Sequence, residues 1–199
     1  MTGRTLDLRR QLHELAFNQA GYFSAAQARA VGYSYQAQKY HADRGNWVRV
    51  DRGLFRLPGW PGAPGDTFAR WTLWSEGRGV VSHDSALSVH ELSDVNPRQV
   101  HLTVPSRFRA QHDAVTTHRA HLREVDVLDR GAWRVTTVER TLADVAMTST
   151  QELVDAAVAE ALERGATSRR LLLRRAHDVP DRAALRLERA LHQNAATGG

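Results

Sequence analysis

Apolar positions near the start of the chain recur with the period of a helix. Leu8, Leu12 and Leu15 lie three and four residues apart, and Gly21 can end the segment. This spacing predicts an amphipathic helix over residues 5–20. Ser24 with Gln27 three positions later has the form of a capping box, and it predicts a second helix that ends near residue 31.

A third helix is expected after a short turn. Gly32 can adopt a left-handed conformation, Ser34 can cap the next helix, and no helix breaker follows before Gly45. The pattern therefore predicts a helix over residues 35–44.

After Gly45 the period of the pattern changes from helical to two. Residues 47–50 and 54–57 predict two short strands, joined by a turn at residues 51–53. Regular alternation would place one set of side chains on the buried face and the two arginines on the other face. The buried set is Val48, Val50, Phe55 and Leu57, and the opposite pair is Arg49 and Arg56.

Residues 58–65 contain three of the six prolines and can continue neither a helix nor a central strand. We therefore expect three parts: a domain over residues 1–58, a linker over 59–65 and an α+β domain over 66–199. The pattern beyond the linker predicts the following elements. Helices are expected at 66–77, 82–92, 137–147, 150–164, 169–177 and 181–193, strands at 99–104 and 115–121, and a hairpin with arms 125–128 and 133–136. Capping boxes are expected from Thr136 with Glu139 and from Ser149 with Glu152.

Composition narrows the class of protein. The 199 residues are 42 % hydrophobic, which is sufficient for ordinary packed cores. The absence of cysteine excludes disulfides, thiolate metal sites and a cysteine nucleophile, and it is compatible with a reducing compartment. The charged N-terminus lacks the form of a signal peptide, and no apolar run approaches the ~18 residues of a membrane span. We expect a cytoplasmic protein without a membrane partner.

The formal net charge of +5 favours polyanionic partners. Lys39 is the only lysine, and this bias toward arginine reflects the composition of the genome rather than a function. Three helices followed by a basic hairpin is the order of a winged helix-turn-helix, whose third helix enters the major groove of DNA. Gln36 can pair with adenine, and Lys39 can reach guanine or phosphate. The expected DNA-binding residues are Ser34, Tyr35, Gln36, Lys39, Tyr40, Arg44, Arg49, Arg52 and Arg56. Gln38 and His41 are unusually polar for the inward face of this helix, and a winged helix that contacts proteins stays an alternative.

The sequence contains few features of a catalytic site. Two histidine pairs that are close in sequence, His83 with His90 and His118 with His121, have spacings that separate their rings on a helix or strand. A metal-dependent nuclease would require a lysine shortly after its acidic residues, but no lysine follows the acidic segment around Asp126. Phosphate-binding loops and nucleophile elbows are also missing. We expect no enzyme activity, no metal site and no cofactor.

Several blocks resemble the family of AbiEi-type antitoxins. The winged-helix blocks are Ser24-Ala-Ala-Gln-Ala28, Gly32 and the segment from Gly45 to Pro58. Blocks at residues 80–92, 100–105 and 135–145 are similar to the C-terminal part of that family, in the same order. The resemblance covers about residues 10–147, whereas residues 148–199 match only as generic helices.

The resemblance implies an antitoxin that binds inverted repeats in its own promoter as an autorepressor. Its C-terminal part would counteract a nucleotidyltransferase toxin of a type IV toxin-antitoxin operon, without a stable complex between the two. One alternative is a stand-alone winged-helix transcription factor whose C-terminal domain dimerises or senses a ligand. A metal-dependent nucleic-acid-processing enzyme is the disfavoured alternative, because the required Glu-x-Lys arrangement is absent.

Overall fold

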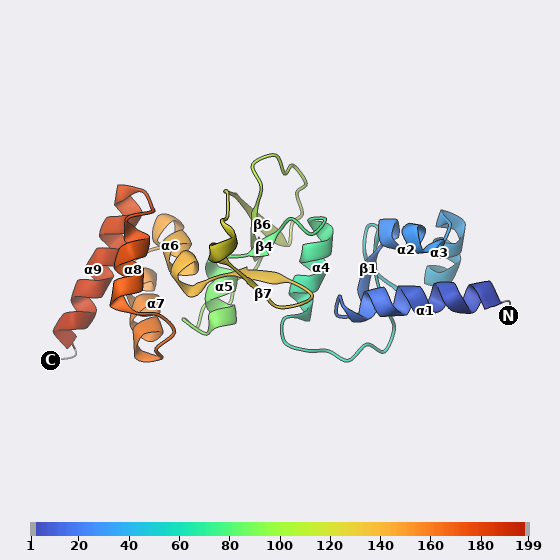
Figure 1. Cartoon of the computed structure of the whole chain (residues 1–199), viewed down its shortest axis with the longest axis horizontal. Helices are drawn as coiled ribbons and strands as arrows, with labels where there is room; N and C mark the ends of the chain where they lie inside the picture. Colours follow the sequence, from blue (N-terminus) through green and yellow to red (C-terminus); the bar gives the residue numbers. More distant parts are fainter. Residues whose placement is uncertain (1–2, 198–199) are drawn as a thin grey trace. The chain divides into compact units, whose positions relative to one another are not determined.

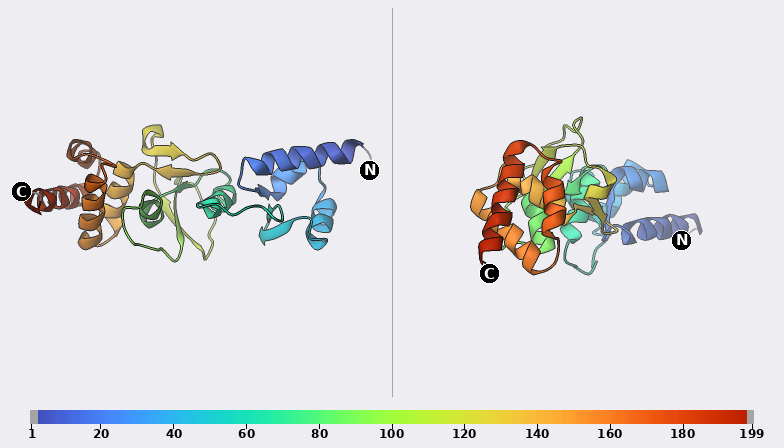
Figure 2. Two further views of the ribbon diagram at one scale, coloured as in Figure 1. Left: turned by 90° about the horizontal axis from the view of Figure 1, so that it is seen from below. Right: turned by 60° about the vertical axis from the view of Figure 1, so that its left-hand side comes forward.

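The computed structural model describes residues 3–197, and the side chains of residues 5–194. The chain packs into two compact units. Among the described residues, the first unit contains residues 3–79 together with 130–133, and the second contains residues 80–129 and 134–197. Helices and strands occur in both units (Figures 1 and 2), which confirms the α+β class. The expected domain boundaries at residues 58 and 66 stay a prediction, because packing alone does not show which segments fold independently. Residues 1, 2, 198 and 199 of those expected domains lie outside the described residues.

The first unit begins with the three helices expected from the sequence. These are α1 (Gly3–Phe17), α2 (Ala25–Val31) and α3 (Tyr35–Asp43), and α4 (Asp66–Trp74) follows later in the chain. The Ser24 hydroxyl accepts a hydrogen bond from the backbone N–H of Gln27, whose side chain accepts one from the Ser24 N–H, so the capping box is confirmed. The Ser34 hydroxyl caps α3 by accepting from the N–H of Ala37. Local capping chemistry thus sets where both helices begin.

A three-stranded antiparallel sheet completes the winged helix. Its order is β1-β3-β2, from β1 (Tyr22–Ser24), β2 (Val48–Asp51) and β3 (Leu54–Arg56). The hairpin was expected, whereas β1 has only three residues and was not. β1 pairs along β3, so that Phe23 lies opposite Phe55.

The expected faces of the hairpin are wrong for β2. Asp51 lies opposite Leu54 next to the turn, but a bulge at Val50 then places Arg49 opposite Phe55 and Val48 opposite Arg56. Since opposed residues of an antiparallel pair share a face, the one-residue shift exchanges the two faces of β2. Val48 is accordingly 46 % exposed rather than buried.

Aromatic rings form the core of the first unit. Phe23 stacks on Phe55 with ring centroids 5.7 Å apart, and it meets Trp47 edge to face at 4.9 Å. Leu12 and Ala16 of α1 pack on the same cluster. In another part of the unit, the rings of Phe68 and Trp133 lie 4.9 Å apart.

The second unit contains a mixed five-stranded sheet of order β6-β5-β4-β8-β7. Its strands are β4 (Val80–Val81), β5 (Val100–Val104), β6 (Val115–Arg119), β7 (Val127–Asp129) and β8 (Arg134–Thr136). β4 pairs antiparallel with β5 and parallel with β8, and β5 pairs parallel with β6. β4 was not expected, and the first arm of the hairpin begins later than expected because a short 3-10 helix, η1 (Glu124–Asp126), precedes β7.

In the described part of the second unit, five α-helices accompany this sheet: α5 (His83–His90), α6 (Val138–Thr148), α7 (Gln151–Glu163), α8 (Arg169–Ala176) and α9 (Asp181–Thr197). α6 to α9 lie together in all views (orange to red in Figures 1 and 2), around a core that includes Leu142, Leu172 and Leu187. The two expected capping boxes are wrong by one position. Thr137 and Thr150 cap α6 and α7 instead, because in each pair of adjacent hydroxyl residues the second one adopts the cap position.

Candidate nucleic-acid interface

The outward face of α3 presents the side chains expected to contact DNA. Tyr35, Gln36, Lys39 and Tyr40 are all exposed, and Tyr35 and Tyr40 retain 62 % and 56 % of their accessible surface. The capped start of α3 at Ser34 is also exposed, so this helix end can face a phosphate. The structure therefore brings these five residues to one helix surface.

The polar inward face of α3 has a specific structural explanation. Gln38 is only 3 % exposed, and its Nε2 group donates hydrogen bonds of 3.1 Å to the carbonyls of Ala25 and Tyr33. These bonds tie α3 to the start of α2 and to the intervening turn. Burying an amide is inexpensive when its donors are paired, so Gln38 can replace an apolar residue here.

His41 also belongs to the inward side of α3. Its ring stacks on Trp47 at 4.8 Å with an interplanar angle of 17°, and it meets Tyr33 edge to face. Burial lowers the pKa of His41, and the nearby charge of Arg9 lowers it further. The neutral ring then behaves as one more aromatic side chain of the core. Gln38 and His41 together fix the rotation that turns Gln36 and Lys39 outward.

The basic residues around α3 fall into two groups. Lys39 forms an ion pair with Asp43 at 2.5 Å, and Arg56 pairs with Asp66 at 2.6 Å. Arg44, Arg49 and Arg52 are exposed and have no carboxylate partner among the described side chains. Arg49 lies 5.7 Å from the centroid of the Phe55 ring. Uncompensated positive charge thus lies at the end of α3 and on the wing.

Arg56 does not join the exposed arginines. Its guanidinium lies 4.6 Å from the Tyr22 ring centroid and also donates to the Ala20 carbonyl. With the Asp66 pair, these contacts leave the Arg56 side chain 22 % exposed. The structure places this residue inside a cluster of contacts within the first unit.

Arg29 is an exposed cation that the sequence analysis did not select. It lies in the last turn of α2, and its guanidinium is 4.9 Å from the centroid of the Tyr35 ring. In a helix-turn-helix the helix before the recognition helix crosses the DNA backbone, so a basic residue at its end was the available signal.

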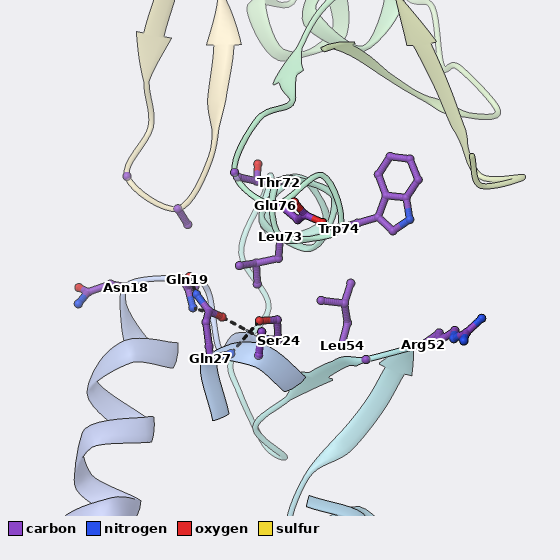
Figure 3. Close-up of a pocket in the computed structure, with 15 residues that line it drawn as sticks. Asn18, Gln19, Ser24, Gln27, Arg52, Leu54, Thr72, Leu73, Trp74 and Glu76 are labelled. Carbon is purple, nitrogen blue, oxygen red and sulfur yellow. Dashed lines mark hydrogen bonds between the residues drawn. The ribbon is translucent and has the colours of Figure 1, made fainter. Parts of the chain in front are cut away.

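A hollow of about 690 Å³ lies within the first unit beside the turn between β2 and β3 (Figure 3). On one wall the amides of Gln19 and Gln27 exchange hydrogen bonds of 2.7 and 3.4 Å. Gln27 is also the capping residue of α2, so this amide pair connects the end of α1 with the start of α2. The polar groups of this wall satisfy one another, and we assign the hollow a structural role.

The second unit contains three histidines in contact that sequence spacing did not predict. His83, His101 and His118 come from α5, β5 and β6, and the rings of His83 and His118 stack 3.4 Å apart. Burial, with a smaller contribution from the neighbouring imidazoles, lowers the pKa of His83 to about 2 and that of His118 to about 4. In the described part of the chain, no group of three or more His, Asp or Glu side chains is arranged to hold a metal ion. His90 instead contacts the Thr136 carbonyl at 2.7 Å.

Asp126, the centre of the acidic segment, is held by arginines. It is 1 % exposed and forms ion pairs with Arg123, Arg140 and Arg175. Burial by itself would raise its pKa, but the arginine hydrogen bonds lower the pKa to about 2. Close by, burial raises the pKa of Asp144 to about 6, even though Arg140 donates to it at 2.9 Å. The carboxylate of Asp126 is therefore engaged in joining η1, α6 and α8.

The helix order, the capped third helix and the β2-β3 wing define a winged helix-turn-helix. Residues 10–58, which contain these elements, match the model of a family described as "Transcriptional regulator, AbiEi antitoxin". The resemblance seen in the sequence is confirmed for this segment, and the match supports a DNA-binding regulator of the antitoxin type. Because the family consists of transcriptional regulators, the match also favours a role without catalysis.

Comparison with other proteins adds information on the fold. The chain is similar in structure to the RV2827C protein from Mycobacterium tuberculosis, with a TM-score of 0.64 and 13 % sequence identity over 98 % of this chain and 78 % of that one. At this identity the likeness concerns the fold alone. No curated protein sequence matches the chain. Among the helices of the described residues, none combines the length and apolar character needed to cross a membrane.

Proposed function

We propose that this protein is an antitoxin that represses its own operon by binding inverted repeats in its promoter through α3 and the wing. The carrying observation is the match of residues 10–58 to the antitoxin regulator family. It is supported by an α3 surface on which Gln36 and Lys39 face outward while Gln38 is buried. This division matches the requirement that a recognition helix expose its reading side chains and bury its opposite face.

The proposed roles of the interface residues follow from their chemistry. Gln36 reads adenine, and Lys39 reaches guanine or phosphate after exchanging its Asp43 partner. Tyr35 and Tyr40 lie at the same surface, and the N–H groups at Ser34 face a phosphate. Arg44, Arg49 and Arg52 neutralise backbone phosphates, and Arg56 contributes least because Asp66 already holds it.

We further propose that the second unit counteracts a nucleotidyltransferase toxin from the same operon, without a stable complex, and that both act in the cytoplasm. The family resemblance supports the action against the toxin, and the absence of cysteine is compatible with the reducing cytoplasm. Within this proposal, the winged helix over residues 1–58 and the α+β part over 66–199 are separate functional domains joined by residues 59–65.

The decisive experiment measures binding of the full chain to its own upstream promoter duplex and to a scrambled duplex of equal length, across a salt series. We expect a clear preference for the promoter and a steep loss of affinity with salt. Lys39→Ala should reduce the preference, and Arg52→Ala should weaken binding to both duplexes. Equal and weak binding to the two duplexes would contradict the proposal.

The toxin part of the proposal has a separate test. Co-expression of the chain with the product of the adjacent gene should relieve growth arrest caused by that product. Purified samples of the two proteins should not co-elute. Persistent growth arrest in the presence of the folded chain would exclude the antitoxin role while leaving DNA binding intact.

A further inference from the structure

Two arginine–tyrosine pairs lie at the two ends of α3. At its start, the guanidinium of Arg29 lies 4.9 Å from the Tyr35 ring centroid. At its end, the guanidinium of Arg44, the C-cap residue, lies 5.5 Å from the Tyr40 ring centroid. These distances are within the ~6 Å range of a cation–π contact. Each pair therefore restricts where its guanidinium can lie.

The charges of these two arginines remain uncompensated. Neither Arg29 nor Arg44 has a carboxylate partner among the described side chains, whereas Lys39 is paired with Asp43. A tyrosine ring attracts a cation without neutralising its net charge, because the ring contributes only a quadrupole. The guanidinium groups are thus positioned and still able to donate to an anion.

The placement of the pairs fits the dimensions of DNA. α3 has nine residues, which corresponds to a length of about 13 Å. The major groove is about 12 Å wide between its phosphate walls. Cations at both ends of such a helix can reach backbone phosphates while the middle of the helix faces the bases.

A purely structural role for both arginines is the competing explanation. Arg29 lies in the last turn of α2 and Arg44 caps α3, and a cation at a helix C-terminus is favoured by the helix dipole. That role predicts an effect on thermal stability, with no effect on the salt dependence of DNA binding. The two explanations therefore differ in a measurable quantity.

We propose that Tyr35 and Tyr40 are supports that hold Arg29 and Arg44 against DNA phosphates at the two ends of α3, rather than side chains that read bases. This inference rests on the proposed DNA-binding function and adds Arg29 to the interface. It divides α3 into a reading part, Gln36 with Lys39, and two phosphate contacts. Affinity would then depend on the arginines, and sequence preference on the reading part.

The test uses the full chain, its own promoter duplex and a scrambled duplex of equal length. Arg29→Ala and Arg44→Ala should each reduce the slope of log affinity against log salt concentration by about 0.9, for both duplexes. The ratio of the two affinities should stay unchanged. Arg10→Ala is the matched control, because Arg10 is an exposed arginine of α1 that lies 3.7 Å from Asp7. Thermal melts of each variant show whether the fold is retained.

Substitution of the tyrosines separates a supporting ring from a contacting hydroxyl. Tyr35→Phe and Tyr40→Phe should keep the affinity and the salt slope, whereas Tyr35→Leu and Tyr40→Leu should lower both. Phenylalanine variants as weak as the leucine variants would overturn the inference, as would an unchanged salt slope in Arg29→Ala and Arg44→Ala. A wild-type chain without promoter preference would instead contradict the proposed function itself.

Discussion

Replacement of Gln38 should show how strongly its two hydrogen bonds fix the rotation of α3. Gln38→Ala removes the donors to the Ala25 and Tyr33 carbonyls, each worth about 1 kcal/mol, and leaves those carbonyls without this partner. The lost side-chain methylene adds about 1 kcal/mol. The expected cost is ~3 kcal/mol, which corresponds to a decrease in Tm of roughly 12–24 °C for a unit of this size.

Tryptophan fluorescence is a selective assay for this effect. All five tryptophans of the chain belong to the first unit, so a thermal melt followed by their fluorescence reports on that unit alone. Gln36→Ala on the exposed face of the same helix is the matched control, and it should change stability by no more than about 0.5 kcal/mol. Gln38→Leu keeps most of the volume and separates lost hydrogen bonds from lost packing.

The same variants distinguish the two faces of α3 in function. Gln36→Ala should lower the preference for the promoter duplex and leave the melting temperature unchanged. Gln38→Ala should lower the melting temperature and, at temperatures where it remains folded, keep the preference for the promoter duplex. If Gln38→Ala melted like the wild type, the buried hydrogen bonds would not determine the rotation of α3. A loss of promoter preference in folded Gln38→Ala would mean that these hydrogen bonds are needed to hold Gln36 and Lys39 outward.

Three further predictions concern stability. Because the pKa values of His83 and His118 in the folded state lie below the ordinary 6.5, their contribution is present above pH 6.5 and is lost as the pH falls toward 4. The urea midpoint of the full chain should therefore decrease over this range, and less so in His118→Gln; identical pH profiles would refute the role of the cluster. Arg56→Ala should cost roughly 2 kcal/mol in a fluorescence melt by removing the charged hydrogen bond to Asp66, with an unchanged salt slope of DNA binding. A reduced slope would place this arginine on DNA. Asp126→Ala should destabilise the second unit by about 3–5 kcal/mol in circular dichroism melts, because it leaves the largely buried Arg175 without its carboxylate partner, whereas Arg140 keeps Asp144. A change below about 1 kcal/mol would show that water replaces the carboxylate.

Local chemistry explains what the sequence predicted well. The capping box at Ser24 and the cap at Ser34 act over three residues, so the starts of α2 and α3 could be located from adjacent positions. The same applies to the outward set on α3, which follows from helical periodicity once the helix is located. For α6 and α7 two hydroxyl residues are adjacent in sequence, and in each pair the second one is the cap.

Features that depend on long-range contacts escaped the sequence analysis. Strands of two or three residues, such as β4 and β1, are too short to show a period. The bulge at Val50 shifts a register that alternation alone would have kept regular. The cluster of His83, His101 and His118 joins three elements that are far apart in sequence, so spacing within one element could not reveal it.

The tip of the β7-β8 hairpin limits how this chain can be divided. Residues 130–133 belong to the first unit although residues on both sides belong to the second, so the chain passes between the two units three times. A fragment that stops at residue 79 would lack Trp133, whose ring packs on Phe68 and closely approaches Gly65. Such a fragment would therefore lose this aromatic contact. Chimeras that exchange the first unit between related regulators would have to carry four residues of a distant hairpin along with it.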